Sequence, residues 1–121
     1  MPKTKVIFFA EENGNCPLIG WMDGIPSKVN IKCIVKIERL AEMGYELRRP
    51  EADFLRDGIY ELRVASQGVQ YRMLYFFSGK QAVISHGLIK RSNEVPPREI
   101  NLAIERKTLF EKDPQKHVYG G

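Results

Sequence analysis

The stretch "GIYELRVASQGVQYRMLYFF", residues 58–77, decides the fold expected for this chain. Apolar and polar side chains alternate on both sides of a Ser-Gln-Gly segment, which is typical of two strands joined by a tight turn. With Gln67 and Gly68 at the centre of the turn, the glycine supplies the positive φ that two-residue hairpin turns favour. The pattern therefore predicts a β-hairpin in a defined register.

This register places Arg63 directly opposite Arg72 on one face of the hairpin. The other face is expected to be the core, because its opposed pairs are Tyr60 with Tyr75, Leu62 with Met73 and Val64 with Tyr71. Like charges in directly opposed positions repel each other. An anion between them would explain the pair, and the planar guanidinium group suits phosphate oxygens. The alternative is a solvated face on which Glu61 and the C-terminal helix neutralise both arginines.

The other elements follow from hydrophobic periodicity and from end signals. The longest helix is expected between Ser27, a good N-cap, and Gly44, a good residue to follow a helix end. The full expectation is strands at 3–10, 58–65, 69–77 and 80–89, helices at 16–24, 28–43 and 97–112, a loop at 45–54 and a loose tail at 113–121. This predicts one α+β domain over residues 1–121, in which an N-terminal strand and a helical hairpin pack on a small antiparallel sheet in the order β-α-α-β-β-β-α.

Composition narrows the class of protein. The chain has 121 residues, a net charge of +4 and 43% hydrophobic residues, which is typical of one globular domain with a mild preference for anionic partners. It contains no apolar run of the roughly 20 residues that span a bilayer, and no signal peptide is expected, so we predict a cytoplasmic protein. Cys16 and Cys33 form no CxxC motif and have no ligand-like spacing to His86 or His117. We therefore expect two reduced thiols, and neither a metal nor a cofactor.

The strand expected at 80–89 leaves two arrangements open. Strict alternation puts Val83, Ser85, Ile89 and Arg91 on the arginine face, and Ile84, His86 and Lys90 on the core side. A bulge at Gly87 would instead bring Lys90 round to the arginines. By alternation His86 is expected to be a buried, hydrogen-bonded core histidine. A catalytic His86 would need an irregular strand.

At this point the residues resemble a known family. The pieces that carry the resemblance occur in family order: "IVKIERLAEMG", "LRDGIYELR", "YRMLYFF" and "HGLIKRSNEVPPREINLA". They are similar to the RelE/ParE superfamily of bacterial toxins, and most of all to its phage-derived, HigB-like branch. The resemblance implies a RelE-like fold and the toxin of a type II toxin–antitoxin system that cuts mRNA, usually on the ribosome. It also implies a HigA-like helix-turn-helix antitoxin, through which alone the toxin would reach operator DNA.

The resemblance falls on the two arginines that the strand register isolates, and on Lys90 and Arg91 after the last strand. A metal-free ribonuclease needs a base for the 2′-hydroxyl, cations for the phosphorane and an acid for the leaving oxygen. We assign Arg63 and Arg72 to phosphate and transition-state binding and Lys90 to general acid or base catalysis, with His86 as the alternative acid–base group. Arg91 is an expected phosphate contact, although members of this branch often have an aromatic residue before Lys-Lys where this chain has "LIKR".

The sequence leaves open the role of two further basic residues, and it allows two alternative functions for the protein. Arg48 and Arg49 are candidate RNA contacts, and their simpler interpretation is a solvated loop. A ParE-like inhibitor of DNA gyrase would use the same fold without enzymatic activity. A degenerate phage-derived protein would only bind its antitoxin. A nuclease needs Arg63, Arg72 and Lys90 to converge on one phosphate, whereas a gyrase inhibitor does not.

Overall fold

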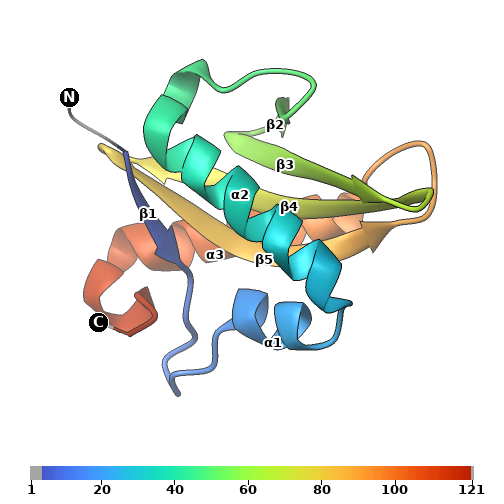
Figure 1. Ribbon diagram of the computed structural model, residues 1–121. Coiled ribbons are helices and arrows are strands. Elements are labelled where there is room, and N and C mark those ends of the chain that lie inside the picture. The colour runs from blue at the N-terminus through green and yellow to red at the C-terminus, as the bar shows by residue number, and fades with distance from the viewer. Residues whose placement is uncertain (1–3, 121) are drawn as a thin grey trace.

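The computed structural model describes residues 4–120 and contains a mixed five-stranded sheet in the order β1-β5-β4-β3-β2 (Figure 1). The edge strand β1 runs parallel to β5, and all other neighbours are antiparallel. The strands are β1 (Lys5–Phe8), β2 (Ala52–Arg56), β3 (Ile59–Ser66), β4 (Val69–Ser78) and β5 (Gln81–Lys90). The helices are α1 (Pro17–Asp23), α2 (Ser27–Met43) and α3 (Pro97–Lys112), with short 3-10 turns η1 (Gly44–Glu46) and η2 (Pro114–His117). The predicted α+β class is confirmed.

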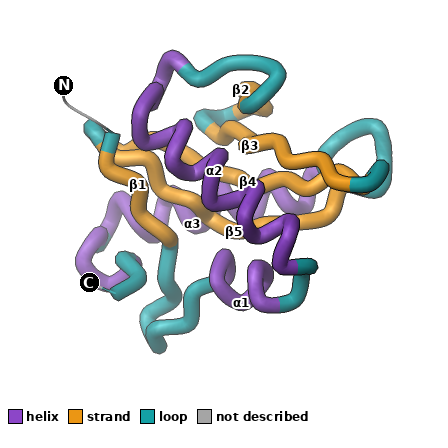
Figure 2. The backbone as a smooth tube through the Cα atoms, in the orientation of Figure 1, coloured by secondary structure: helices purple, strands orange, loops and turns teal. Residues whose placement is uncertain are grey.

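Helices cover both faces of the sheet (Figure 2). The first core lies under α1 and α2 and includes Leu62, Met73 and Ile84; the second lies under α3 and includes Leu74, Phe76 and Val83. The helical hairpin was expected on one face, and the structure places it there. The helix α3 covers much of the opposite face, which carries the arginines, and the alternative in which the C-terminal helix shares that face is right in this respect.

The hairpin register is confirmed residue by residue. Arg63 pairs with Arg72, and Leu62 pairs with Met73 on the core side. Gln67 and Gly68 have φ angles of 51° and 79°, so both central turn residues lie in the left-handed region that two-residue hairpins require.

The strand β5 is irregular, but not at Gly87. The register between β4 and β5 shifts because Leu74 pairs with His86 while Tyr75 pairs with Ile84, which leaves Ser85 as the extra residue. Strict alternation is therefore wrong beyond Ser85. His86 and Lys90 both turn to the arginine face, where Lys90 pairs with Gln70.

Two smaller differences concern the starts of β2 and α2, whereas the end of α2 is as expected. The expected loop at 45–54 contains the start of β2, which pairs with β3 from Ala52 to Arg56. The helix α2 begins one residue early, so Ser27 is its first helical residue and Pro26 takes the cap position. Gly44 ends α2 at φ 54°, and a Cβ there would lie 2.3 Å from Oγ1 of Thr4, so only glycine fits.

The segment expected to be a loose tail packs against the body. His117 is buried and its Nδ1 lies 2.8 Å from the carbonyl oxygen of Ala10, while Val118 forms a bridge with Phe9. Residue 3 of the expected first strand and residue 121 of the expected tail lie outside the described residues. Within residues 4–120, no helix is long and apolar enough to cross a bilayer.

Candidate functional site

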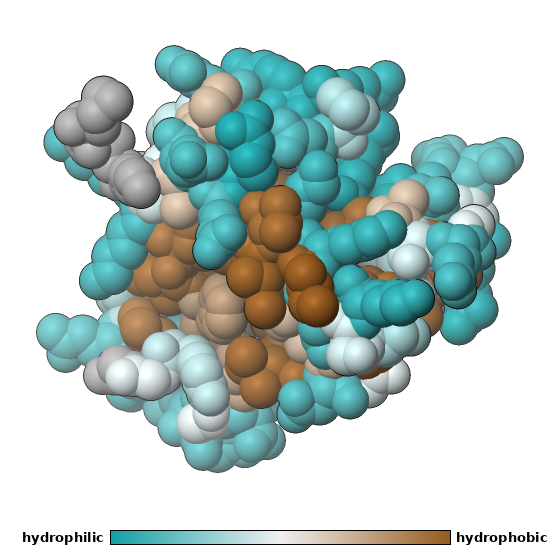
Figure 3. Space-filling view, viewed as in Figure 1, coloured by the Kyte–Doolittle hydropathy of each residue, from teal (hydrophilic) through white to brown (hydrophobic). Residues whose placement is uncertain are grey.

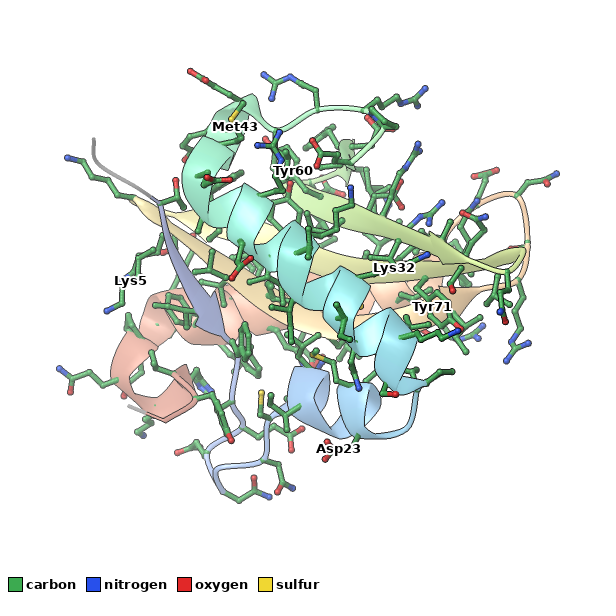
Figure 4. All side chains as sticks on the ribbon, in the orientation of Figure 1. Lys5, Asp23, Lys32, Met43, Tyr60 and Tyr71 are labelled. Atoms are coloured by element: carbon green, nitrogen blue, oxygen red, sulfur yellow. The ribbon has the colours of Figure 1, made fainter. Side chains whose placement is uncertain are left out.

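A cleft of about 600 Å³ opens where α2 passes the end of β3. At that point β3 is an edge, because its pairing with β2 stops at Leu62. Figure 4 shows Lys32 between α2 and the two strands of the hairpin. All charged residues that line the cleft are basic, and the rest of the lining is mainly apolar: Lys32, Lys36, Arg63 and Arg72, with Ile31, Val35, Pro50, Val64, Ala65 and Gln70. The cleft is therefore suited to an anion.

The two arginines are held by one carboxylate. Arg63 donates from Nε to Oε2 of Glu61 over 2.9 Å, and Arg72 donates from Nε to Oε1 over 3.1 Å. Glu61 is only 3% exposed. This carboxylate offsets the repulsion between the opposed guanidinium groups and fixes both of them. Neutralisation by Glu61, which the sequence left open, is thus part of the structure, but it engages one nitrogen of each arginine.

The terminal nitrogens of the two arginines are less fully occupied. Arg72 Nη1 donates to the carbonyl oxygen of Tyr71 over 3.0 Å, whereas its Nη2 forms no hydrogen bond with the described residues. The side chain of Arg63 is 30% exposed, and its Nη2 lies 3.6 Å from Oδ2 of Asp53.

The two arginines differ in how far their side chains are buried. Arg72 is 5% exposed, and loss of solvent lowers its pKa, although the Glu61 charge acts in the opposite direction. The group stays positively charged at neutral pH because an arginine pKa starts far above 7. Arg63 is therefore the accessible member of the pair, and Arg72 is its buried neighbour.

Two lysines of α2, Lys32 and Lys36, complete the cleft. Lys32 Nζ donates to the carbonyl oxygen of Ala65 over 3.0 Å, and Lys36 Nζ donates to Glu51 over 3.2 Å. Helical periodicity correctly puts them outside the apolar stripe. It does not show that this side of α2 passes the open edge of β3, so no signal in the sequence identified them.

Lys90 and Arg91 lie beside the cleft rather than in its lining. Lys90 pairs in register with Gln70, which does line the cleft. Its own side chain borders a neighbouring opening of about 310 Å³ together with Glu61, Arg56 and Glu94. Arg91 is exposed and directly follows β5.

Arg48 and Arg49 also lie outside the lining of the cleft. Arg48 donates from Nη1 to the carbonyl oxygens of Tyr45 and Leu47. Arg49 donates to Oδ2 of Asp53 from two nitrogens, over 2.9 and 2.7 Å, and its side chain is 71% exposed. Arg48 borders a separate aromatic opening.

His86 is buried and hydrogen-bonded, as expected, but on the face opposite to the one that alternation predicted. Its Nε2 lies 2.9 Å from Oε1 of Glu99 in α3, and its Nδ1 lies 2.7 Å from Oγ of Ser85. One neutral tautomer satisfies both contacts, because Nε2–H donates to Glu99 while Nδ1 accepts the serine hydroxyl. Burial lowers the pKa of His86, and the hydrogen bond to Glu99 only partly offsets this. The structure therefore does not bring His86 to the cleft.

Trp21 and the cysteines are in structural positions. The ring of Trp21 covers Gly87, where a Cβ would lie 2.1 Å from Cε3, and it meets Tyr71 edge-on at 6.2 Å. Cys16 and Cys33 are free, and burial raises the pKa of Cys33 to about 11. Within residues 4–120, no three His, Cys, Asp or Glu side chains come together as a metal site.

The five-stranded sheet with its three helices is consistent with a small RelE-like α+β fold. The family model of the Gp49-like phage-derived proteins matches residues 20–108, which is more than half of the chain. The chain therefore belongs to the phage-derived Gp49-like family, which is a RelE-like toxin family. No curated protein matches it.

Proposed function

We propose that this protein is the toxin of a type II toxin–antitoxin system and that it cleaves mRNA as a metal-independent endoribonuclease. One observation carries the proposal: Arg63 and Arg72, opposed in register, line the same cleft as Lys32 and Lys36, and all charged lining residues are basic. A phosphodiester is the anion in RNA that such a set of cations binds. The ribosome is the expected setting of the reaction, in line with the family resemblance.

In the proposed reaction, the RNA 2′-hydroxyl attacks the adjacent phosphorus and the bond to the 5′-oxygen breaks. The products are a 2′,3′-cyclic phosphate and a new 5′-hydroxyl end. Negative charge grows on the non-bridging oxygens, and fixed cations stabilise it best when they need no rearrangement. Glu61 provides this fixation, because it holds Arg63 and Arg72 by their Nε atoms and leaves terminal nitrogens for the phosphate.

Proton transfer is assigned to Lys90. The bulge at Ser85 turns Lys90 to the arginine face, next to Gln70 at the rim of the cleft. His86 is the weaker candidate, because Ser85 and Glu99 already occupy both of its ring nitrogens. Arg91, at the end of β5, is proposed to contact a neighbouring phosphate.

Removal of Arg63 tests the proposal. After induction in a bacterial host, we expect the parent to arrest growth and primer extension to show new 5′ ends within mRNA. The Arg63→Ala variant should cleave roughly 10²- to 10³-fold more slowly, the usual effect of losing one electrostatic donor. The fold should persist, because the Arg63 side chain is 30% exposed. Arg72→Ala would be a poorer test, because Arg72 is buried beside Glu61.

Arg98→Ala is the matched control. It removes a guanidinium group that is 81% exposed at the start of α3 and does not line the cleft, so cleavage should stay at the parental level. Full toxicity of Arg63→Ala would show that the cleft is not the site at which RNA is cleaved. Growth arrest with intact mRNA and inhibited gyrase would favour the ParE-like alternative, and no growth arrest by the parent would favour a degenerate protein that only binds an antitoxin.

The antitoxin partner is proposed to cover the same region. Three aliphatic side chains on α2 are exposed: Ile31 (63%), Ile34 (48%) and Val35 (48%). The helix α2 crosses the face shown in Figure 3, and an apolar area occupies the centre of that face. Aliphatic groups offer no stacking surface to bases, so this strip suits a protein segment with apolar side chains. Lys32 and Lys36 beside it favour an acidic segment, which would at the same time close the cleft.

Rescue of growth tests this partner. Co-expression with the helix-turn-helix protein encoded beside the toxin gene should neutralise the parent. Ile34→Lys should remain toxic but escape rescue, because Ile34 does not line the cleft and a charge there would face the apolar segment. Leu109→Lys is the control, since Leu109 is 41% exposed on α3, away from the cleft. Equal rescue of both variants would exclude the strip on α2 as the docking surface.

A further inference from the structure

A second opening, lined by aromatic side chains, adjoins the basic cleft. Its volume is about 360 Å³, and it is lined by Tyr45, Leu47, Arg48, Asp53, Phe54 and Tyr60. Two of its rings are unusually accessible, since Tyr45 is 56% and Phe54 52% exposed. Tyr60 lies near the C-terminal end of α2 in Figure 4. Large exposed rings around a concave surface are typical of a binding site rather than of a folding core.

The rings are held in place from below. Tyr45 stacks on Phe77 with centroids 3.9 Å apart, and Phe54 meets Tyr60 edge-on at 5.1 Å. Tyr60 in turn stacks on Tyr75, which is 1% exposed, at 5.4 Å. The exposed rings therefore rest on the half-buried rings of Phe77 and Tyr60, and little conformational freedom is lost when a flat ligand binds.

The polar groups of the opening suit a nucleobase. The guanidinium group of Arg48 is held by the carbonyl oxygens of Tyr45 and Leu47 and presents a cationic plane at the wall. Asp53 supplies a carboxylate whose Oδ1 accepts from the backbone N–H of Phe54 and whose Oδ2 accepts from Arg49. A lone pair left on these oxygens can accept from an exocyclic amino group or a ring N–H. Aromatic faces together with a planar cation form the usual platform for unpaired bases.

One ion pair separates this opening from the basic cleft. Asp53 lines the aromatic opening, and its Oδ2 lies 3.6 Å from Nη2 of Arg63, which lines the cleft. A strand of RNA whose phosphate lies against Arg63 can therefore place a neighbouring base among the rings. This continuity favours RNA over a protein side chain as the occupant.

We propose that the opening formed by Tyr45, Phe54 and Tyr60 is a nucleobase-stacking subsite for single-stranded RNA, next to the phosphate held by Arg63. The subsite rests on the proposed ribonuclease function and adds to it a group that recognises the substrate. Phe54 supplies the exposed face, Arg48 a cationic plane, and Asp53 an acceptor that can favour bases with an amino or imino donor.

Titration with matched oligonucleotides tests the subsite. The probes are a fluorescein-labelled 2′-O-methyl RNA hexamer, which cannot be cleaved through its 2′-oxygen, and the same backbone with all bases removed. Fluorescence anisotropy should show that Phe54→Ala binds the complete hexamer roughly 5- to 150-fold more weakly than the parent, the range for one stacked base. Binding of the abasic backbone should not change, because the phosphate contacts remain.

Two further variants separate stacking from apolar contact and from unfolding. Phe54→Leu keeps an apolar side chain without a π face, so it should lose most of the same affinity, whereas Phe54→Trp should retain it. Tyr119→Ala removes another exposed ring, 48% accessible and near the C-terminus, and should bind as the parent does. Parental affinity of Phe54→Ala or of Phe54→Leu would overturn stacking.

The outcomes also distinguish this proposal from the proposed function. If Phe54→Ala binds the hexamer normally while Arg63→Ala loses cleavage, the subsite is wrong and the nuclease stands. If Phe54→Ala binds RNA normally but escapes rescue by the antitoxin, the opening is a protein-docking surface instead. If the parent binds neither probe and leaves mRNA intact in cells, both proposals fail.

Discussion

Two polar clusters lie on the same face of the sheet, and they differ in what covers them. The Arg63–Glu61–Arg72 cluster lies where the pairing of β2 with β3 ends, and its two arginines line a cleft. The Ser85–His86–Glu99 cluster lies under α3, and the His86 side chain is 8% exposed against 30% for Arg63. Both contain groups that could act on RNA, but only one is accessible to it.

The comparison shows that side-chain chemistry and strand face are not enough to identify a site. His86 has the more suitable acid–base chemistry, since histidine normally titrates near neutral pH. The structure uses it to join the bulge of β5 to the first turn of α3, with Arg106 donating to the carbonyl oxygen of Ser85 at 3.3 Å. Arg63 lies at the end of the hairpin that α3 leaves open, and it can therefore meet a ligand.

The largest effect is expected from removing the carboxylate of the open cluster. Glu61→Ala leaves the buried Arg72 guanidinium group without its ion-pair partner, which should lower the free energy of unfolding by about 3–5 kcal/mol. Urea denaturation measures this. Glu111→Ala removes an exposed ion pair with Lys107 on α3 and should change stability by at most about 1 kcal/mol. Equal effects of the two substitutions would show that Glu61 does not hold the arginines.

A smaller, pH-dependent effect is expected from the covered cluster. Burial, more than any other cause, lowers the pKa of His86, with Glu99 opposing and Arg106 adding to the shift. The unfolded chain takes up the proton near the ordinary value of about 6.5, whereas the folded chain does so only at lower pH. The unfolded state thus binds more protons as the pH falls below about 6.5, and stability that is fully present above this pH is lost.

Denaturation between pH 5 and 7 measures this loss, which should reach at most about 1.4 kcal/mol per pH unit. His86→Gln removes the titrating group and should flatten the profile in this window, although it also lowers stability at pH 7. Arg63→Ala should leave the slope unchanged, because Arg63 belongs to the open cluster. An unchanged slope in His86→Gln would assign the titration to another group and break the contrast between the two clusters.

Several elements could be predicted because their signals are local. The hairpin, its turn at Gln67 and Gly68, the helix after Ser27 and the start of α3 at Pro97 all depend on residues within a few positions of one another. The strand β2 was missed because "RRPEADF" carries a loop signal at Pro50, and its pairing with β3 is a tertiary contact. The same limit hid Lys32 and Lys36, whose role depends on where α2 crosses the sheet.

The sequence by itself determined that two arginines stand opposite each other on a core-forming hairpin, because strand alternation and a two-residue turn leave no other register. Only the tertiary structure decided which part of that face stays open. The packing of α3, the bulge at Ser85 and the passage of α2 along the free edge of β3 result from burying apolar surface between segments far apart in the chain, and no local pattern encodes where those surfaces meet.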